Sequence, residues 1–210
     1  FSKEIKMIDP NYVIDAVNNA KQELYVHHKT LDILEGNLEY YVLKCLEKQL
    51  SPRVFSYAKE RMVPINIFPR YVDKLTNIYQ TGVTREIKDG NQSDSDLLSW
   101  YEKELHFNST MHIANRLYNA CRSTLVHPYM SYDGPALKII QNDRFIVCSD
   151  DPINPMKPTM IILLAGKDNL DREIYWVYTD LEFKVVKSDR SIDYEAMAQM
   201  GIPDGVNPYQ

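Results

Sequence analysis

The sequence has few of the residues on which nucleotide and hydrolase chemistry depends. Only seven of its 210 residues are glycine, and none lies in a GxGxxG, GxxxxGK or GxSxG pattern. Such patterns bring backbone amides against a phosphate, or expose a nucleophilic serine at a sharp turn. We therefore expect no dinucleotide-binding domain, no phosphate-binding loop and no serine hydrolase.

Long apolar runs and paired cysteines are also missing. The longest uninterrupted apolar run, Met160 to Ala165, is far shorter than the roughly 20 residues of a membrane-spanning helix. No basic start followed by an apolar stretch marks a signal peptide. Cys45, Cys121 and Cys148 form no CxxC pair, so we expect free thiols that act as small core residues in a reducing compartment.

The sequence has too few basic residues for a protein that binds nucleic acid with high affinity. The chain has 24 lysines and arginines against 29 acidic residues, for a net charge of -5 and a pI near 5.6. Binding to DNA through its phosphates requires clustered lysine and arginine. Any contact with DNA is therefore expected to be loose or localised.

Capping signals and apolar periodicity predict helices in the first part of the chain. Asp9 and Pro10 begin a long helix, whose narrow apolar seam runs from Val13 to Leu34 before Gly36 ends it. A seam so narrow suits one partner helix, and Leu24 lies at its centre. Residues 63–68 are expected to be extended between two prolines. Further helices are expected over residues 38–50, 51–62, 72–82, 95–105 and 108–125.

After about Val126 the chain becomes rich in β-branched and aromatic residues separated by turn formers. Strands are expected over residues 136–140, 145–148, 160–165, 174–179 and 183–186. Their short connections favour antiparallel pairing. The sequence thus predicts an α+β fold, with a helical region over residues 1–126 and a mainly antiparallel β region over residues 127–210, packed together.

A candidate catalytic group lies on the last of these strands. Glu182 and Lys184 form an ExK pair on one side of the strand, where Glu182 could bind Mg²⁺ and Lys184 could orient an attacking water. The possible partner carboxylates upstream are Asp150, Asp151, Asp171 and Asp180. A half-exposed strand with Phe183 buried shows the same alternation, however. We expect no enzyme, no metal and no cofactor, with a magnesium-dependent nuclease as the alternative.

Fifteen tyrosines are spread through the predicted helices and strands. Their large, partly polar side chains suit contacts between subunits. Ordinary amphipathic packing is the interpretation that the sequence favours, and contacts between subunits are the alternative.

The segment from Val63 to Leu75, with its continuation to Tyr79 and Arg85, resembles the portal proteins of tailed bacteriophages. In that family an asparagine-led extended piece enters a helix of the wing region. Residues 114–117, 143–147, 150–151 and 205–209 are similar to the family in order and spacing. The chain lacks the long stem helices, the clip and the tunnel loop. We expect an N-terminal and wing fragment of a longer protein, since the chain begins at Phe1 and ends in a loop-like segment.

The resemblance implies a structural, non-enzymatic protein of the virion that assembles in the host cytoplasm. The family forms a homomeric, usually dodecameric ring at one capsid vertex, through which double-stranded DNA is packaged and ejected without sequence-specific binding. Its partners are the terminase, the capsid and the tail or adaptor proteins. An acidic balance would keep the duplex sliding. The motif and subunit-contact candidates are Asn66, Arg70, Asp73, Tyr79, Arg85 and Leu24. A virion or scaffold protein with no channel is the remaining alternative.

Overall fold

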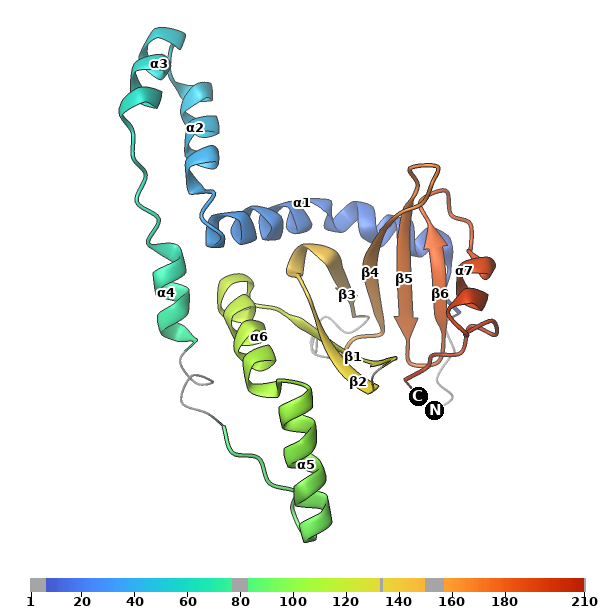
Figure 1. The fold of residues 1–210 in the computed structure, drawn as a ribbon. Coiled ribbons are helices and arrows are strands. Elements are labelled where there is room, and N and C mark those ends of the chain that lie inside the picture. The colour runs from blue at the N-terminus through green and yellow to red at the C-terminus, as the bar shows by residue number, and fades with distance from the viewer. Residues whose placement is uncertain (1–6, 77–82, 133, 150–156, 210) are drawn as a thin grey trace. The chain divides into compact units, whose positions relative to one another are not determined.

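The computed structural model describes residues 7–76, 83–132, 134–149 and 157–209 (Figure 1). The chain divides into two compact units. The first, here called the sheet unit, comprises Phe1–Tyr25 and Asp143–Gln210; the second, the helical unit, is Val26–Asn142. Helix α1 (Pro10–Leu34) has residues in both. This division differs from the expected boundary at residue 126.

The sheet unit is built on four antiparallel strands in the order β3-β4-β5-β6. Their bounds are Phe145–Cys148, Met160–Lys167, Glu173–Thr179 and Phe183–Lys187. The pairing of β4 with β5 shifts register between Leu164 and Gly166, where Gly166 has a φ of 134° that other residues rarely adopt. The predicted antiparallel strands after Val126 are confirmed here.

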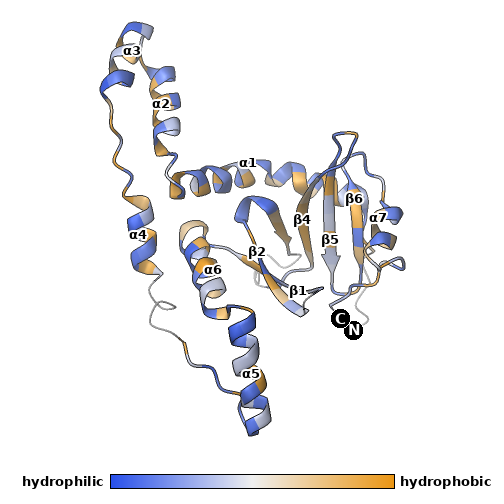
Figure 2. Ribbon diagram, in the orientation of Figure 1, coloured by the Kyte–Doolittle hydropathy of each residue, from blue (hydrophilic) through white to orange (hydrophobic). Residues whose placement is uncertain are grey.

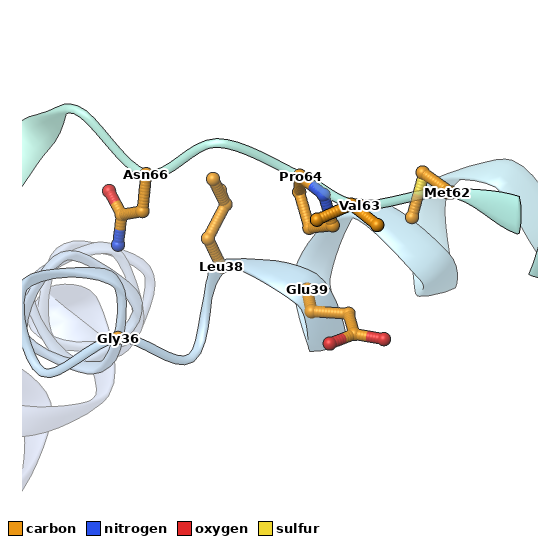
Figure 3. A pocket seen from close by; sticks show the side chains of 7 residues that line it. All are labelled: Gly36, Leu38, Glu39, Met62, Val63, Pro64 and Asn66. Atoms are coloured by element: carbon orange, nitrogen blue, oxygen red, sulfur yellow. The ribbon is translucent and has the colours of Figure 1, made fainter.

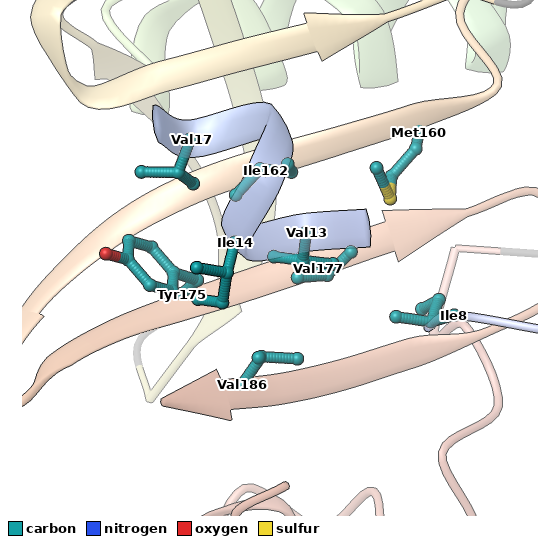
Figure 4. Packing of buried hydrophobic residues seen from close by; sticks show 9 residues of the cluster. All are labelled: Ile8, Val13, Ile14, Val17, Met160, Ile162, Tyr175, Val177 and Val186. Atoms are coloured by element: carbon teal, nitrogen blue, oxygen red, sulfur yellow. The ribbon is translucent and has the colours of Figure 1, made fainter. Parts of the chain in front are cut away.

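The core of the sheet unit lies between the first turns of α1 and one face of the sheet (Figure 4). Val13 and Val17 of α1 pack there with Ile162 of β4, Val177 of β5 and other apolar side chains. Ile162 and Val177 are fully buried. Full burial of such a side chain contributes about 1.5–3 kcal/mol, so this face fixes the beginning of α1.

The other face of β6 is covered by the short helix α7 (Tyr194–Gln199), which Figure 1 shows beside that strand. Phe183 and Val185 of β6 form a second core with Met197 of α7. The Asp193 side chain caps α7 by accepting a hydrogen bond of 3.1 Å from the Ala196 amide. A helix of six residues is too short to show an apolar period, so the sequence does not indicate it.

The helical unit contains five further helices and a β hairpin within its described residues. They are α2 (Leu38–Gln49), α3 (Pro52–Arg61), α4 (Phe68–Leu75), α5 (Gln92–Glu104), α6 (Phe107–Cys121), β1 (Leu125–Ser131) and β2 (Gly134–Ile140). Its core joins Leu31 and Leu34 of α1, Val72 of α4, and Leu117 and Cys121 of α6. The α+β fold class is therefore confirmed.

Several local predictions in this unit were wrong. Helix α4 begins at Phe68 instead of Val72 and ends at Leu75, because Pro69 is tolerated in the first turn of a helix. Helix α5 begins at Gln92 instead of Ser95, because Asn91 and Asp94 form a capping box. Helix α6 ends at Cys121 instead of Leu125, because Arg122 takes a left-handed φ of 64°. The residues that follow form β1, which was not expected. The second half of the helix predicted over residues 72–82 lies outside the described residues.

The narrow apolar seam of α1 was expected to pack on one partner helix, and this prediction was wrong. Its first half, including Val13, packs on the sheet, and its last turns pack with α4 and α6. Leu24, between the two, is half-buried. Cysteine burial was also only partly predicted: Cys121 is buried and Cys148 partly buried, but Cys45 is exposed because α2 buries no residue.

Candidate functional site

The helical unit has helices whose apolar side chains are not covered by the rest of the chain. Helices α2, α3 and α5 contain no buried residue. Val54 and Tyr57 of α3, and Leu97 and Trp100 of α5, are each about half exposed or more. Figure 2 shows apolar positions along these helices among hydrophilic ones. Such exposed apolar surface is typical of contact with another molecule.

The extended segment between α3 and α4 adds to this surface. Val63, Ile65 and Ile67 are 84%, 81% and 71% exposed. Met62, Pro64 and Asn66, which alternate with them, are partly buried. This period of two is the pattern of an extended chain with one covered face. The prediction of an extended piece before the helix is confirmed for residues 63–67, whereas Phe68 begins α4. The open side of this piece is apolar.

A hollow of about 290 Å³ lies between this segment and the turn from α1 to α2 (Figure 3). In Figure 3 the Leu38 side chain points from the start of α2 toward the segment, between Asn66 and Pro64. The lining residues are Gly36, Leu38, Glu39, Met62, Val63, Pro64 and Asn66. Glu39 is the one charged group among them, so the hollow itself offers no set of groups for catalysis.

Asn66, a motif candidate, fastens the extended segment to the end of α1. Its Nδ2 donates a hydrogen bond of 2.6 Å to the carbonyl oxygen of Ile33, in the last turn of α1. Its Oδ1 accepts a hydrogen bond of 3.2 Å from the Phe68 amide, at the start of α4. The side chain therefore holds three elements in register, because an amide offers both a donor and an acceptor.

Two further motif candidates also make contacts within the helical unit. Asp73 of α4 pairs with Arg116 of α6, with 2.7 Å between Oδ1 and Nε. Arg85 pairs with Glu102 at 2.6 Å and lies 4.3 Å from the ring centroid of Phe107. These side chains join α4 to α6 and the segment before α5 to α5 and α6, so they support the helices.

The remaining candidates are not brought together with these three. Arg70 is exposed and makes no ion pair with any residue that the structure describes. Tyr79 lies outside the described residues. Leu24 lies on α1, half-buried. The motif candidates thus form supports for the helical unit and not one compact site.

The Glu182 and Lys184 pair of the sheet unit lies on one side of β6, as expected from their alternation. Lys184 Nζ is 3.2 Å from Glu182 Oε2, and the side chains are only 18% and 23% exposed. The Ile8 amide donates a hydrogen bond of 2.9 Å to Glu182 Oε2, and Lys184 Nζ donates one of 3.4 Å to the Ile8 carbonyl oxygen. The pair binds the backbone just before α1.

An acidic and basic cluster at the loops of the sheet unit perturbs several pKa values. Hydrogen bonds from the Ser191 hydroxyl and amide and from the Arg172 guanidinium lower the pKa of Asp189 to about 2. Partial burial alone would raise the pKa of Asp168, but hydrogen bonds from the Arg172 backbone and side chain outweigh it and lower that pKa. Arg172 lies between the two carboxylates, so this cluster joins the loop after β4 to the loop after β6.

Comparison of the chain with protein-family models and with curated proteins finds no match. Among the residues that the structure describes, no three histidine, cysteine, aspartate or glutamate side chains gather closely enough to hold a metal ion. No helix in the described part of the chain is long and apolar enough to cross a bilayer.

The candidate functional site is therefore the exposed surface of α2, α3, the extended segment and α5. The amino-acid sequence does not indicate that these residues form an exposed surface. Apolar periodicity indicates that a helix face will be covered, and it does not tell whether the cover belongs to the same chain. The one sequence signal for this surface was the abundance of tyrosine.

Proposed function

We propose that this chain is a structural, non-enzymatic subunit of the portal ring of a tailed bacteriophage, through which double-stranded DNA passes. The observation that carries the proposal is that α2, α3 and α5 bury no residue within the chain although they bear large apolar side chains. The resemblance of residues 63–85 to portal proteins indicates that the assembly is a homomeric ring. Other copies of the chain supply the missing cover.

Helix length supports an assembled state. Helices α3 and α5 have 10 and 13 residues. Isolated helices shorter than about 12–15 residues are marginal in water, and most of their stability comes from packing an apolar face. Neither helix contributes a buried residue to a core, so we infer that a neighbouring subunit stabilises them.

Charge supports a channel that does not hold DNA. With a net charge of -5 the chain neutralises few phosphates. Each neutralised phosphate would add to a binding free energy that has to be overcome at every step of translocation. The nuclease alternative loses support because Glu182 and Lys184 are occupied by the Ile8 backbone.

The test measures the mass of the purified chain by light scattering over a range of concentrations, together with its action on plasmid DNA. We expect a homo-oligomer of many copies that leaves the plasmid intact in Mg²⁺ or Mn²⁺. A chain that stays monomeric at every concentration would contradict the proposal. Plasmid cutting that disappears in a Glu182→Ala variant would replace it with the nuclease.

A further inference from the structure

The exposed helices of the helical unit carry opposite charge. Between Leu38 and Arg61, α2 and α3 have five basic and three acidic residues. Helix α5, from Gln92 to Glu104, has one basic and four acidic residues. This contrast stands out in a chain whose charges are otherwise mixed, and it gives two unlike surfaces on the same protein.

Each surface has an aromatic side chain between two charges of one sign. Arg53, Tyr57 and Arg61 are spaced by four residues on α3, and the Arg61 guanidinium lies 3.9 Å from the Tyr57 ring centroid. Residues spaced by four lie on one helix face. The α3 face is therefore basic, aromatic and basic in order.

The corresponding face of α5 is acidic, aromatic and acidic. Asp96, Trp100 and Glu104 are again spaced by four residues, and about half of Trp100 is exposed. Within the described part of the chain, neither Arg53 nor Arg61 forms an ion pair, and Asp96 accepts a hydrogen bond only from Gln92 in the preceding turn. Both faces are thus available to a partner.

We propose that the α3 face of one copy (Arg53, Tyr57, Arg61) packs against the α5 face of the next copy (Asp96, Trp100, Glu104). Tyrosine, tryptophan and arginine are the side chains on which interface affinity most often depends. Charge complementarity sets the pairing and its order. Because the two faces differ, each copy offers one of each; such head-to-tail contacts form a ring when the rotation between successive copies closes, and a filament when it does not. The proposed ring corresponds to the closed case.

This inference rests on the proposed ring and names the contact that builds it. Reversing one face leaves like charges opposed, which costs enough to lower affinity by at least about tenfold. The experiment uses two charge-reversal variants, Arg53→Glu/Arg61→Glu and Asp96→Lys/Glu104→Lys, compared by light scattering at a concentration where the original chain is assembled. Helix content by circular dichroism verifies that each variant folds.

We expect neither variant to assemble alone and an equal mixture of the two to assemble, since each contact then again joins unlike charges. Assembly of either variant alone to the original extent would overturn the inference while leaving the ring intact. Failure of the unsubstituted chain to assemble would overturn the ring as well. If Arg53→Glu/Arg61→Glu assembles but no longer binds a DNA duplex that the original chain binds, the α3 face is a nucleic-acid surface and the inference is wrong.

Cross-linking provides a second measurement that does not depend on charge reversal. In a Cys45→Ser background, which removes the exposed native thiol, Val54→Cys and Leu97→Cys variants are treated with a short bismaleimide; these exposed residues lie one turn before Tyr57 and Trp100 and leave both aromatic side chains in place. We expect a covalent dimer when the two variants are mixed and little when each is treated alone. Equal cross-linking in all three samples, or none in the mixture, contradicts the contact between α3 and α5.

Discussion

Asn66 is the residue whose side chain does most to hold the exposed segment in place. It joins the carbonyl oxygen of Ile33 to the amide of Phe68. Asn66→Ala removes both hydrogen bonds, and we expect it to lower the free energy of unfolding by about 1–2 kcal/mol. Urea denaturation measures the loss. Arg70→Ala, at an exposed position four residues later, is the control and should change stability by less than about 0.5 kcal/mol.

Asp189 predicts a dependence of stability on pH. Its pKa is lowered to about 2 from an ordinary value of 3.8, first by the Ser191 hydroxyl and amide and then by Arg172. A carboxyl group with a lowered pKa stabilises the folded state above its ordinary pKa and loses that contribution as pH falls through the folded value. We expect the melting temperature to fall between about pH 4 and pH 2.

The Asp189→Asn variant isolates this contribution, because its amide does not titrate. It should melt below the original chain near pH 6, with a difference that shrinks as pH approaches 2. A difference that stays constant over this range would mean that Asp189 does not carry the pH dependence, and that other carboxylates such as Asp168 do.

At the scale of the elements, Arg122 marks a helix end that the sequence does not show. Its φ of 64° is a conformation that glycine adopts more readily than arginine. We expect Arg122→Gly to raise the free energy of unfolding by up to about 1 kcal/mol. The same change at Ile113, inside α6, should instead destabilise by about 1 kcal/mol or more, because glycine disfavours a helix interior. Thermal or urea unfolding of both variants checks the opposite signs.

Local signals in the sequence predicted the elements better than their partners. Pro10 and Pro52 located the starts of α1 and α3, because proline at a first helical position costs no hydrogen bond. Ser95 is a suitable capping residue in the sequence, but α5 begins at Gln92, because Asn91 and Asp94 form a capping box that depends on side-chain geometry. The end of α6 depends on the left-handed backbone conformation of Arg122, which an arginine in the sequence does not predict.

The seam of α1 shows the limit for packing. Its apolar residues recur as expected, yet Val13 packs on a sheet and Leu34 packs with two helices. A stripe of apolar residues predicts that a helix face will be covered, but it does not indicate which element covers it. For the same reason, the apolar residues of α2 and α5 predicted burial that the single chain does not provide.

At the scale of the whole molecule, the candidate site was predictable only in part. The resemblance drew attention to Asn66, Asp73 and Arg85, which act as supports inside the helical unit. The surface that we assign to assembly consists of their exposed neighbours, such as Ile65 and Trp100. Surfaces between copies depend on a second chain, so neither composition nor periodicity of one chain defines them.

The central claim is that copies of this chain form a closed ring around a channel. Negative-stain electron microscopy of the purified, assembled chain tests it most directly. We expect ring-shaped particles with a central hole and rotational symmetry, and their loss in the Arg53→Glu/Arg61→Glu variant. The account would be contradicted by uniform small particles without a hole, or by filaments that never close, at concentrations where light scattering records an assembled chain.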